Sequence, residues 1–143
     1  MKIQTTRFGD IEVPDERLIT FPEGILGFPQ YHQYALLENE KGPFRWLQSM
    51  ESGSLAFVVV DPLVFFANYR VPARPEDVAL IQLSKPEDAA VLVIMTIRRD
   101  TGEVTANLQG PLVMNAERRL GRQLVLSDPG LSPRQTIAVG AKK

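Results

Sequence analysis

Two short, unbroken apolar runs constrain the fold of this 143-residue chain more than any other feature. They occupy residues 55–60 and 89–97, and both are rich in β-branched side chains. Such a run favours a fully buried strand, although periodicity alone leaves a buried helix open. Turn-forming residues bound both runs, with Ser52-Gly53-Ser54 before the first and Asp100-Thr101-Gly102 after the second. We therefore expect two central strands of a sheet.

Shorter β-prone segments recur about every ten residues, a spacing that suits a barrel or a sandwich. The segment from Ile97 to Val104 predicts a hairpin, because Gly102 can adopt a positive φ. Eleven scattered prolines forbid long helices, so we expect a helical turn or two at residues 75–81 and again at Ser84-Lys85-Pro86-Glu87, which matches a capping box. Further strands are expected at residues 2–7, 17–20, 34–37, 45–50, 104–108, 112–115 and 123–127.

These patterns predict a mainly β fold, namely a small antiparallel β-barrel-like single domain with one or two short helices. The domain is expected to span residues 1–137, and residues 138–143 are expected to form a frayed tail. Hydrophobic residues make up 44% and charged residues 23% of the chain, values that indicate a globular protein rather than a disordered one.

Several classes of function are disfavoured by composition. The absence of cysteine excludes disulfides and thiolate sites and fits a cytoplasmic location. No segment reaches the roughly 20 apolar residues of a membrane span, and the N-terminus carries no apolar signal sequence. A net charge of -1 gives no broad basic field for direct nucleic-acid binding.

Catalytic and metal-binding patterns are also missing from the sequence. The single histidine, His32, is expected to be an ordinary surface residue, and no spacing typical of metal ligands occurs. The acidic pairs Glu76-Asp77 and Glu87-Asp88 fall where helix N-termini collect carboxylates. No nucleotide-binding glycine pattern is present. We therefore expect no enzyme activity, no cofactor and no metal.

Two arginine clusters leave an alternative function open. Arg98-Arg99 and Arg118-Arg119 with Arg122 could contact RNA phosphates if they met on one face, which would make the chain a β-barrel module that binds RNA directly. Solvated hairpin tips explain the same clusters, and Asp100 and Glu103 lie beside the first.

The segment at residues 21–29, which we call the apolar loop, is unlike a filler loop. It carries Phe21, Ile25, Leu26 and Phe28 among two glycines and two prolines. Burying such a side chain is worth roughly 1.5–3 kcal/mol, so something must cover most of them. We expect Phe21 and Phe28 to plug one end of the barrel, whereas Ile25 and Leu26 could either join the plug or form an exposed contact surface.

The same loop resembles the N-terminal signature of the flagellar assembly factor FliW family. The resemblance is carried by residues 21–28 and then 34–37, and it continues in order along nearly the whole chain. The later matching segments are Phe57-Val58-Val59-Val60-Asp61-Pro62, Asn107-Leu108, Pro111-Leu112-Val113-Met114-Asn115 and Gly121-Arg122-Gln123-Leu124-Val125-Leu126.

The resemblance implies a non-catalytic, monomeric cytoplasmic adaptor. Members of the family bind flagellin and, alternatively, the translational repressor CsrA, so this chain is expected to couple flagellin translation to flagellum assembly. We expect no direct contact with nucleic acid or membrane. The chain departs from the family pattern at Gln109-Gly110, where a bulge or bend is expected.

Candidate partner-binding residues follow from the loop and from two other features. Asparagine amides can bind a partner backbone, although they also cap turns at strand ends. The segment at residues 63–69 could be an exposed edge strand that pairs with a partner, although core packing also explains its aromatics. The candidates are Ile25, Leu26, Phe28, Phe65, Phe66, Asn107 and Asn115.

Overall fold

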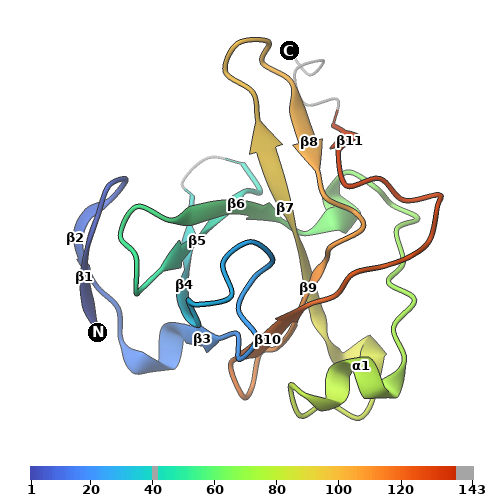
Figure 1. The fold of residues 1–143 in the computed structure, drawn as a ribbon, viewed down its shortest axis with the longest axis horizontal. Coiled ribbons are helices and arrows are strands. Elements are labelled where there is room, and N and C mark those ends of the chain that lie inside the picture. The colour runs from blue at the N-terminus through green and yellow to red at the C-terminus, as the bar shows by residue number, and fades with distance from the viewer. Residues whose placement is uncertain (40–41, 138–143) are drawn as a thin grey trace.

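Within residues 1–39 and 42–137, which the computed structural model describes, seven strands close into a barrel (Figure 1). In order around the barrel they are β7 (Ala90–Ile97), β6 (Ala56–Val60), β5 (Arg45–Ser49), β4 (Gln33–Glu38), β3 (Leu18–Thr20), β10 (Leu120–Gln123) and β9 (Leu112–Asn115). Neighbours are antiparallel except β3 and β10, which are parallel. The expected β-barrel-like single domain is confirmed, and the expected tail at residues 138–143 lies outside the described residues.

Strand β7 closes the barrel because it is long enough to serve two partners along one side. Its first half pairs with β9, with Leu92 opposite Leu112, and its second half pairs with β8 (Val104–Ala106), with Met95 opposite Ala106. The chain between β8 and β9 has more residues than the facing part of β7, so it bulges outward there. The bend expected at Gln109-Gly110 falls inside this bulge.

The expected hairpin between Ile97 and Val104 is also confirmed. These two residues face each other, and Gly102 in the connecting turn has a φ of 75°. Strand β8 then pairs on its outer side with β11 (Gln135–Thr136), a strand that the sequence analysis did not predict. Figure 1 shows this extension standing out from the barrel at the top.

A separate hairpin packs on the outside of the barrel, at the left of Figure 1. The expected strand at residues 2–7 ends early, as β1 (Lys2–Thr5), and pairs with an unpredicted strand, β2 (Gly9–Glu12). The apolar side chains of this hairpin pack with the outward-facing residues Ala35 and Met50. Trp46 lies on the same outer side, with the Arg7 guanidinium 4.4 Å from its ring centroid.

Period-two alternation places the core inside the barrel. Paired residues share a face, so Leu36 lies opposite Leu47 and Val59 lies opposite Ile94, and all four pack inward. Each fully buried aliphatic side chain stabilises the fold by roughly 1.5–3 kcal/mol. The inward-facing stripe of each strand therefore fixes its register.

The helices are as short as expected, but the capping box predicted at Ser84 is absent. Helix α1 (Pro75–Ala79) begins with proline, and Asp77 accepts a hydrogen bond from the Arg74 backbone N–H at 2.8 Å. The Ser84 capping box does not form, because the 3-10 helix η3 (Pro86–Asp88) begins one residue later, after Lys85, with no side-chain cap. Proline at the first position already removes one N–H that would need a partner.

The strand expected at residues 123–127 is wrong in its bounds. The last residue of β10 is Gln123, opposite Leu112, and the next residue of the facing chain is Pro111. Proline has no N–H to donate, so the regular ladder stops there. The chain stays extended, and Leu124 and Leu126 still donate to the carbonyls of Pro111 and Gln109.

Candidate partner-binding surface

The tip of the apolar loop is a tight turn built by its second glycine. The Phe28 N–H donates to the Ile25 carbonyl at 2.7 Å, and Gly27 has a φ of 92°. This is the geometry of a type II turn, which requires a positive φ at its third position and so favours glycine there. Leu26 occupies the second position, at the outer corner of the turn.

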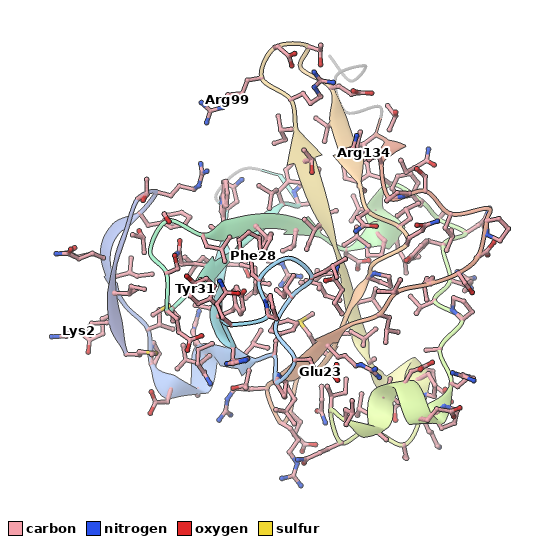
Figure 2. The ribbon with its side chains drawn as sticks, viewed as in Figure 1. Lys2, Glu23, Phe28, Tyr31, Arg99 and Arg134 are labelled. Carbon is pink, nitrogen blue, oxygen red and sulfur yellow. The ribbon has the colours of Figure 1, made fainter. Side chains whose placement is uncertain are left out.

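The turn separates the four apolar side chains of the loop into two groups. Phe21 and Ile25 are buried in the barrel core, and Phe28 is half-buried with its ring centroid 5.8 Å from that of Phe57. Leu26 points away and stays 71% exposed. Figure 2 shows Phe28 and Tyr31 at the barrel end that the loop covers. The loop is therefore a plug that leaves one leucine in solvent.

A glutamine from the barrel wall holds this leucine in place. The side-chain oxygen of Gln123 accepts a hydrogen bond from the Leu26 N–H at 2.8 Å, and its amide nitrogen donates to the Gly110 carbonyl at 3.0 Å. One side chain thus joins the apolar loop to the bulge between β8 and β9. Gln123 was not among the predicted site residues, because a contact between residues 97 positions apart leaves no local signal in the sequence.

Asn107 organises the bulge that Gln123 contacts. Its side-chain oxygen accepts hydrogen bonds from the N–H groups of Gln109 and Gly110 at 3.1 and 2.9 Å. A Cβ at Gly110 would lie 2.7 Å from the Asn107 amide nitrogen and 2.8 Å from that of Gln123. The oxygen of Asn107 therefore caps a turn, and glycine at position 110 leaves room for both amides.

Val125 extends the exposed apolar surface beside Leu26. Its neighbours Leu124 and Leu126 are buried, so Val125 points outward and is 75% exposed. In an extended chain, residues 123 and 125 lie on one side and about 7 Å apart. Because Gln123 contacts the Leu26 N–H, we infer that Leu26 and Val125 share one surface, which we call the Leu26 surface.

The other candidate residues lie elsewhere and are largely occupied within the fold. Asn115 is buried, donates to the Ile81 carbonyl at 2.8 Å and accepts from the Arg118 N–H at 3.1 Å. Phe65 and Phe66 are half-buried against the core around β7 and β8, and Phe65 stacks on Phe44. These contacts agree with the alternatives that asparagine caps a turn and that the two phenylalanines pack in the core.

Of the two alternatives for residues 63–69, the edge strand does not form. The 3-10 helix η2 (Pro62–Val64) occupies its start, with Asp61 accepting from the Leu63 N–H at 2.9 Å. Proline at the first helical position and an aspartate cap favour a helical turn over a strand. This turn exposes Leu63 and Val64, which belong to the candidate segment but were not among its named candidate residues.

The arginine clusters do not form one basic face. Arg98 pairs with Asp100 at 2.9 Å at the tip of the β7–β8 hairpin. Arg122 pairs with Glu23 at 3.1 Å and donates to the Asp77 carbonyl. Figure 1 shows that hairpin at the top and the turn between β9 and β10, which carries Arg118 and Arg119, at the bottom. The two clusters therefore offer RNA no shared phosphate-binding surface.

His32 has no metal-binding neighbours among the described residues, which contain no group of three or more potential ligands. Its backbone N–H donates to the Glu51 carboxylate, which also accepts from the Gln33 N–H at 3.1 Å. These hydrogen bonds, that from His32 first, lower the pKa of Glu51. No helix in the described ranges is long and apolar enough to cross a membrane.

Comparisons with known proteins agree on one family. The family model described as FliW protein matches residues 2–137. The flagellar assembly factor FliW of Natranaerobius thermophilus is 44% identical over 88% of this chain and 85% of its own length. That of Treponema denticola is 39% identical over 90% and 87%. A crystal structure of the flagellar assembly factor FliW superimposes with a TM-score of 0.87 and 34% identity, covering 95% of this chain and 96% of the other.

Proposed function

This chain belongs to the FliW family, and we propose that it is a non-catalytic cytoplasmic adaptor that binds flagellin and, alternatively, CsrA. Membership gives it a role in flagellar assembly. The proposed role is regulatory. When flagellin is exported and becomes scarce, the freed monomer captures CsrA and relieves repression of flagellin messenger RNA.

The observation that supports an adaptor is the rigid presentation of Leu26. A surface leucine on a flexible loop loses conformational freedom when a partner covers it, and this loss reduces affinity. Leu26 instead sits at the corner of a type II turn and is held through its own N–H by Gln123. Covering it is worth roughly 1.5–3 kcal/mol, enough to make it an anchor of a small interface.

Mutual exclusion follows if both partners need the Leu26 surface. Two partners that bind one surface compete, so the amount of free flagellin sets the amount of adaptor left for CsrA. This competition turns a binding domain into a sensor of flagellin supply.

The proposal is tested by titrating purified chain with flagellin and with CsrA from the same organism in a calorimeter. We expect a 1:1 complex with flagellin and displacement of bound CsrA when flagellin is added. Leu26→Asp should weaken binding of at least one partner by tenfold or more. Leu80→Asp is the matched control, since Leu80 is 56% exposed at the end of α1.

Absence of both complexes would overturn the adaptor role. Equal losses from Leu26→Asp and Leu80→Asp would remove the Leu26 surface from it. A gel shift of RNA by the chain alone, weakened by salt, would favour the RNA-binding alternative instead.

A further inference from the structure

The barrel end opposite the apolar loop opens into a groove of about 1120 Å³. Its floor is the end of the barrel core, where the largely buried side chains of Leu92 and Met114 line the groove. One wall is formed by Val71 from the segment that precedes α1 and by Val78 from α1 itself. The two ends of the barrel interior therefore differ from each other: the apolar loop plugs one, and the other opens into a groove with an apolar floor.

Arginines from separate parts of the chain surround this floor. Arg45 lies opposite Val59 in the ladder between β5 and β6, and Val59 is a core residue, so Arg45 also faces inward at the mouth. Arg17, at the end of the 3-10 helix η1 (Asp15–Arg17), and Arg119, in the turn between β9 and β10, line the same groove. Arg70 joins them from the segment that follows η2.

The charges of these arginines are weakly compensated. Arg45 approaches Glu38 only to 3.9 Å, and Glu38 is largely exposed, so this pair contributes little. Arg17 and Arg119 form no salt bridge with any residue that the structure describes. The lining holds three carboxylates, Glu16, Asp61 and Glu87, against four arginines, and none of the three forms a salt bridge with a lining arginine within the described residues.

We propose that this groove binds an acidic amphipathic segment of a protein, in which aliphatic side chains cover the floor and carboxylates pair with the arginines. A guanidinium binds a carboxylate through two parallel hydrogen bonds, which makes arginine the suited partner. A small amphiphile with one carboxylate matches only one arginine. The groove has arginines on four separate segments and exceeds the usual volume of a small-molecule pocket, so it fits a chain with several carboxylates.

This binding site goes beyond the proposed function, because it uses the opposite end of the barrel from the Leu26 surface. The proposed site in the groove does not depend on whether flagellin or CsrA binds the Leu26 surface. It also gives the chain a second surface, so one partner could be held while the Leu26 surface contacts another.

The test is a titration of the isotope-labelled full chain, followed by nuclear magnetic resonance, with a blocked synthetic peptide of about twelve residues containing leucine and glutamate. The amide signals of Leu92 and Met114 should shift, and that of Leu26 should not. A peptide with lysine in place of glutamate should bind at least tenfold more weakly. Decanoate should also bind at least tenfold more weakly than the acidic peptide.

Arg17→Gln combined with Arg119→Asn should weaken the acidic peptide by about tenfold. Asparagine is chosen because it tolerates the positive φ of 57° at Arg119. Arg99→Gln is the matched control, because Arg99 is exposed at the hairpin tip (Figure 2) and does not line the groove. Equal binding of both peptides, tighter binding of decanoate, or no effect of the double variant would overturn the proposal. None of these readouts involves flagellin or CsrA.

Discussion

The Leu26 N–H donates to the side-chain oxygen of Gln123 at 2.8 Å, and this contact fixes the exposed leucine of the apolar loop to the barrel wall. The same amide reaches the Gly110 carbonyl in the neighbouring bulge. A loop tip is thereby restrained from outside the loop itself.

Gln123→Leu should preserve the fold and loosen the loop tip. Leucine has a similar size but can neither accept from Leu26 nor donate to Gly110. Hydrogen exchange at the Leu26 amide should accelerate at least tenfold, and partner affinity should fall severalfold. Gln109→Leu is the control, because it removes a contact to the Leu131 carbonyl and leaves the Leu26 amide alone. Equal exchange rates in both variants would contradict the restraint.

Gly24→Ala should destabilise the chain more than Gly27→Ala. Both glycines have a positive φ, which costs a residue with a Cβ about 1–2 kcal/mol. At Gly27 the added carbon meets open space, whereas at Gly24 it would lie 2.6 Å from the Pro29 Cα. We expect the second penalty to add about 1–3 kcal/mol for overpacking. Urea unfolding of both variants measures the difference, and equal free energies of unfolding would refute the steric argument.

Tyr69→Phe and Tyr34→Phe should change stability in different directions. The Tyr69 hydroxyl donates to the Leu108 carbonyl at 2.7 Å, so its removal leaves a buried carbonyl with one partner fewer and should cost about 1–2 kcal/mol. The Tyr34 hydroxyl is buried without a hydrogen-bond partner among the described residues. Its removal should be neutral or stabilise by up to about 1 kcal/mol. Thermal unfolding of the two variants tests the contrast, and a large loss in Tyr34→Phe would contradict it.

Stability should fall as the pH rises above 10. Burial raises the pKa of Tyr34 and of Tyr69 to about 12, from the ordinary value of 10.0 that applies in the unfolded chain. Between these values the unfolded chain loses the phenolic protons first, so ionisation favours unfolding. The stabilisation is complete below pH 10 and is lost as the pH approaches 12. Melting temperatures from pH 8 to 11.5 measure the decline, which should be shallower in Tyr69→Phe. A flat profile would contradict the raised pKa values.

Local patterns predicted most strands because each depends on neighbours in sequence. The apolar runs at residues 55–60 and 89–97 became β6 and β7, and Gly102 marked the hairpin. Two of the errors fall where a distant partner decided the outcome. Pro111 ended the ladder of β10 after Gln123, and β11 exists through its pairing with β8. Neither event is encoded in the residues of the affected strand.

In the apolar loop, too, local sequence decided some features and distant contacts decided others. Its composition determined that most of its side chains must be covered, because four large apolar groups in water would cost several kcal/mol. Its glycines determined a tight turn. The choice between Ile25 and Leu26 was left open by sequence, and the structure buried the first and exposed the second.

The sequence by itself determined the strands, the turns and the need for a plug, since these depend on side-chain shape and backbone freedom within a few residues. Only the tertiary structure decided that Leu26 rather than Ile25 faces solvent, that Gln123 restrains it, and that Arg17, Arg45 and Arg119 surround one apolar mouth. Those relationships arise when the barrel closes, because closure brings together residues that the chain holds far apart.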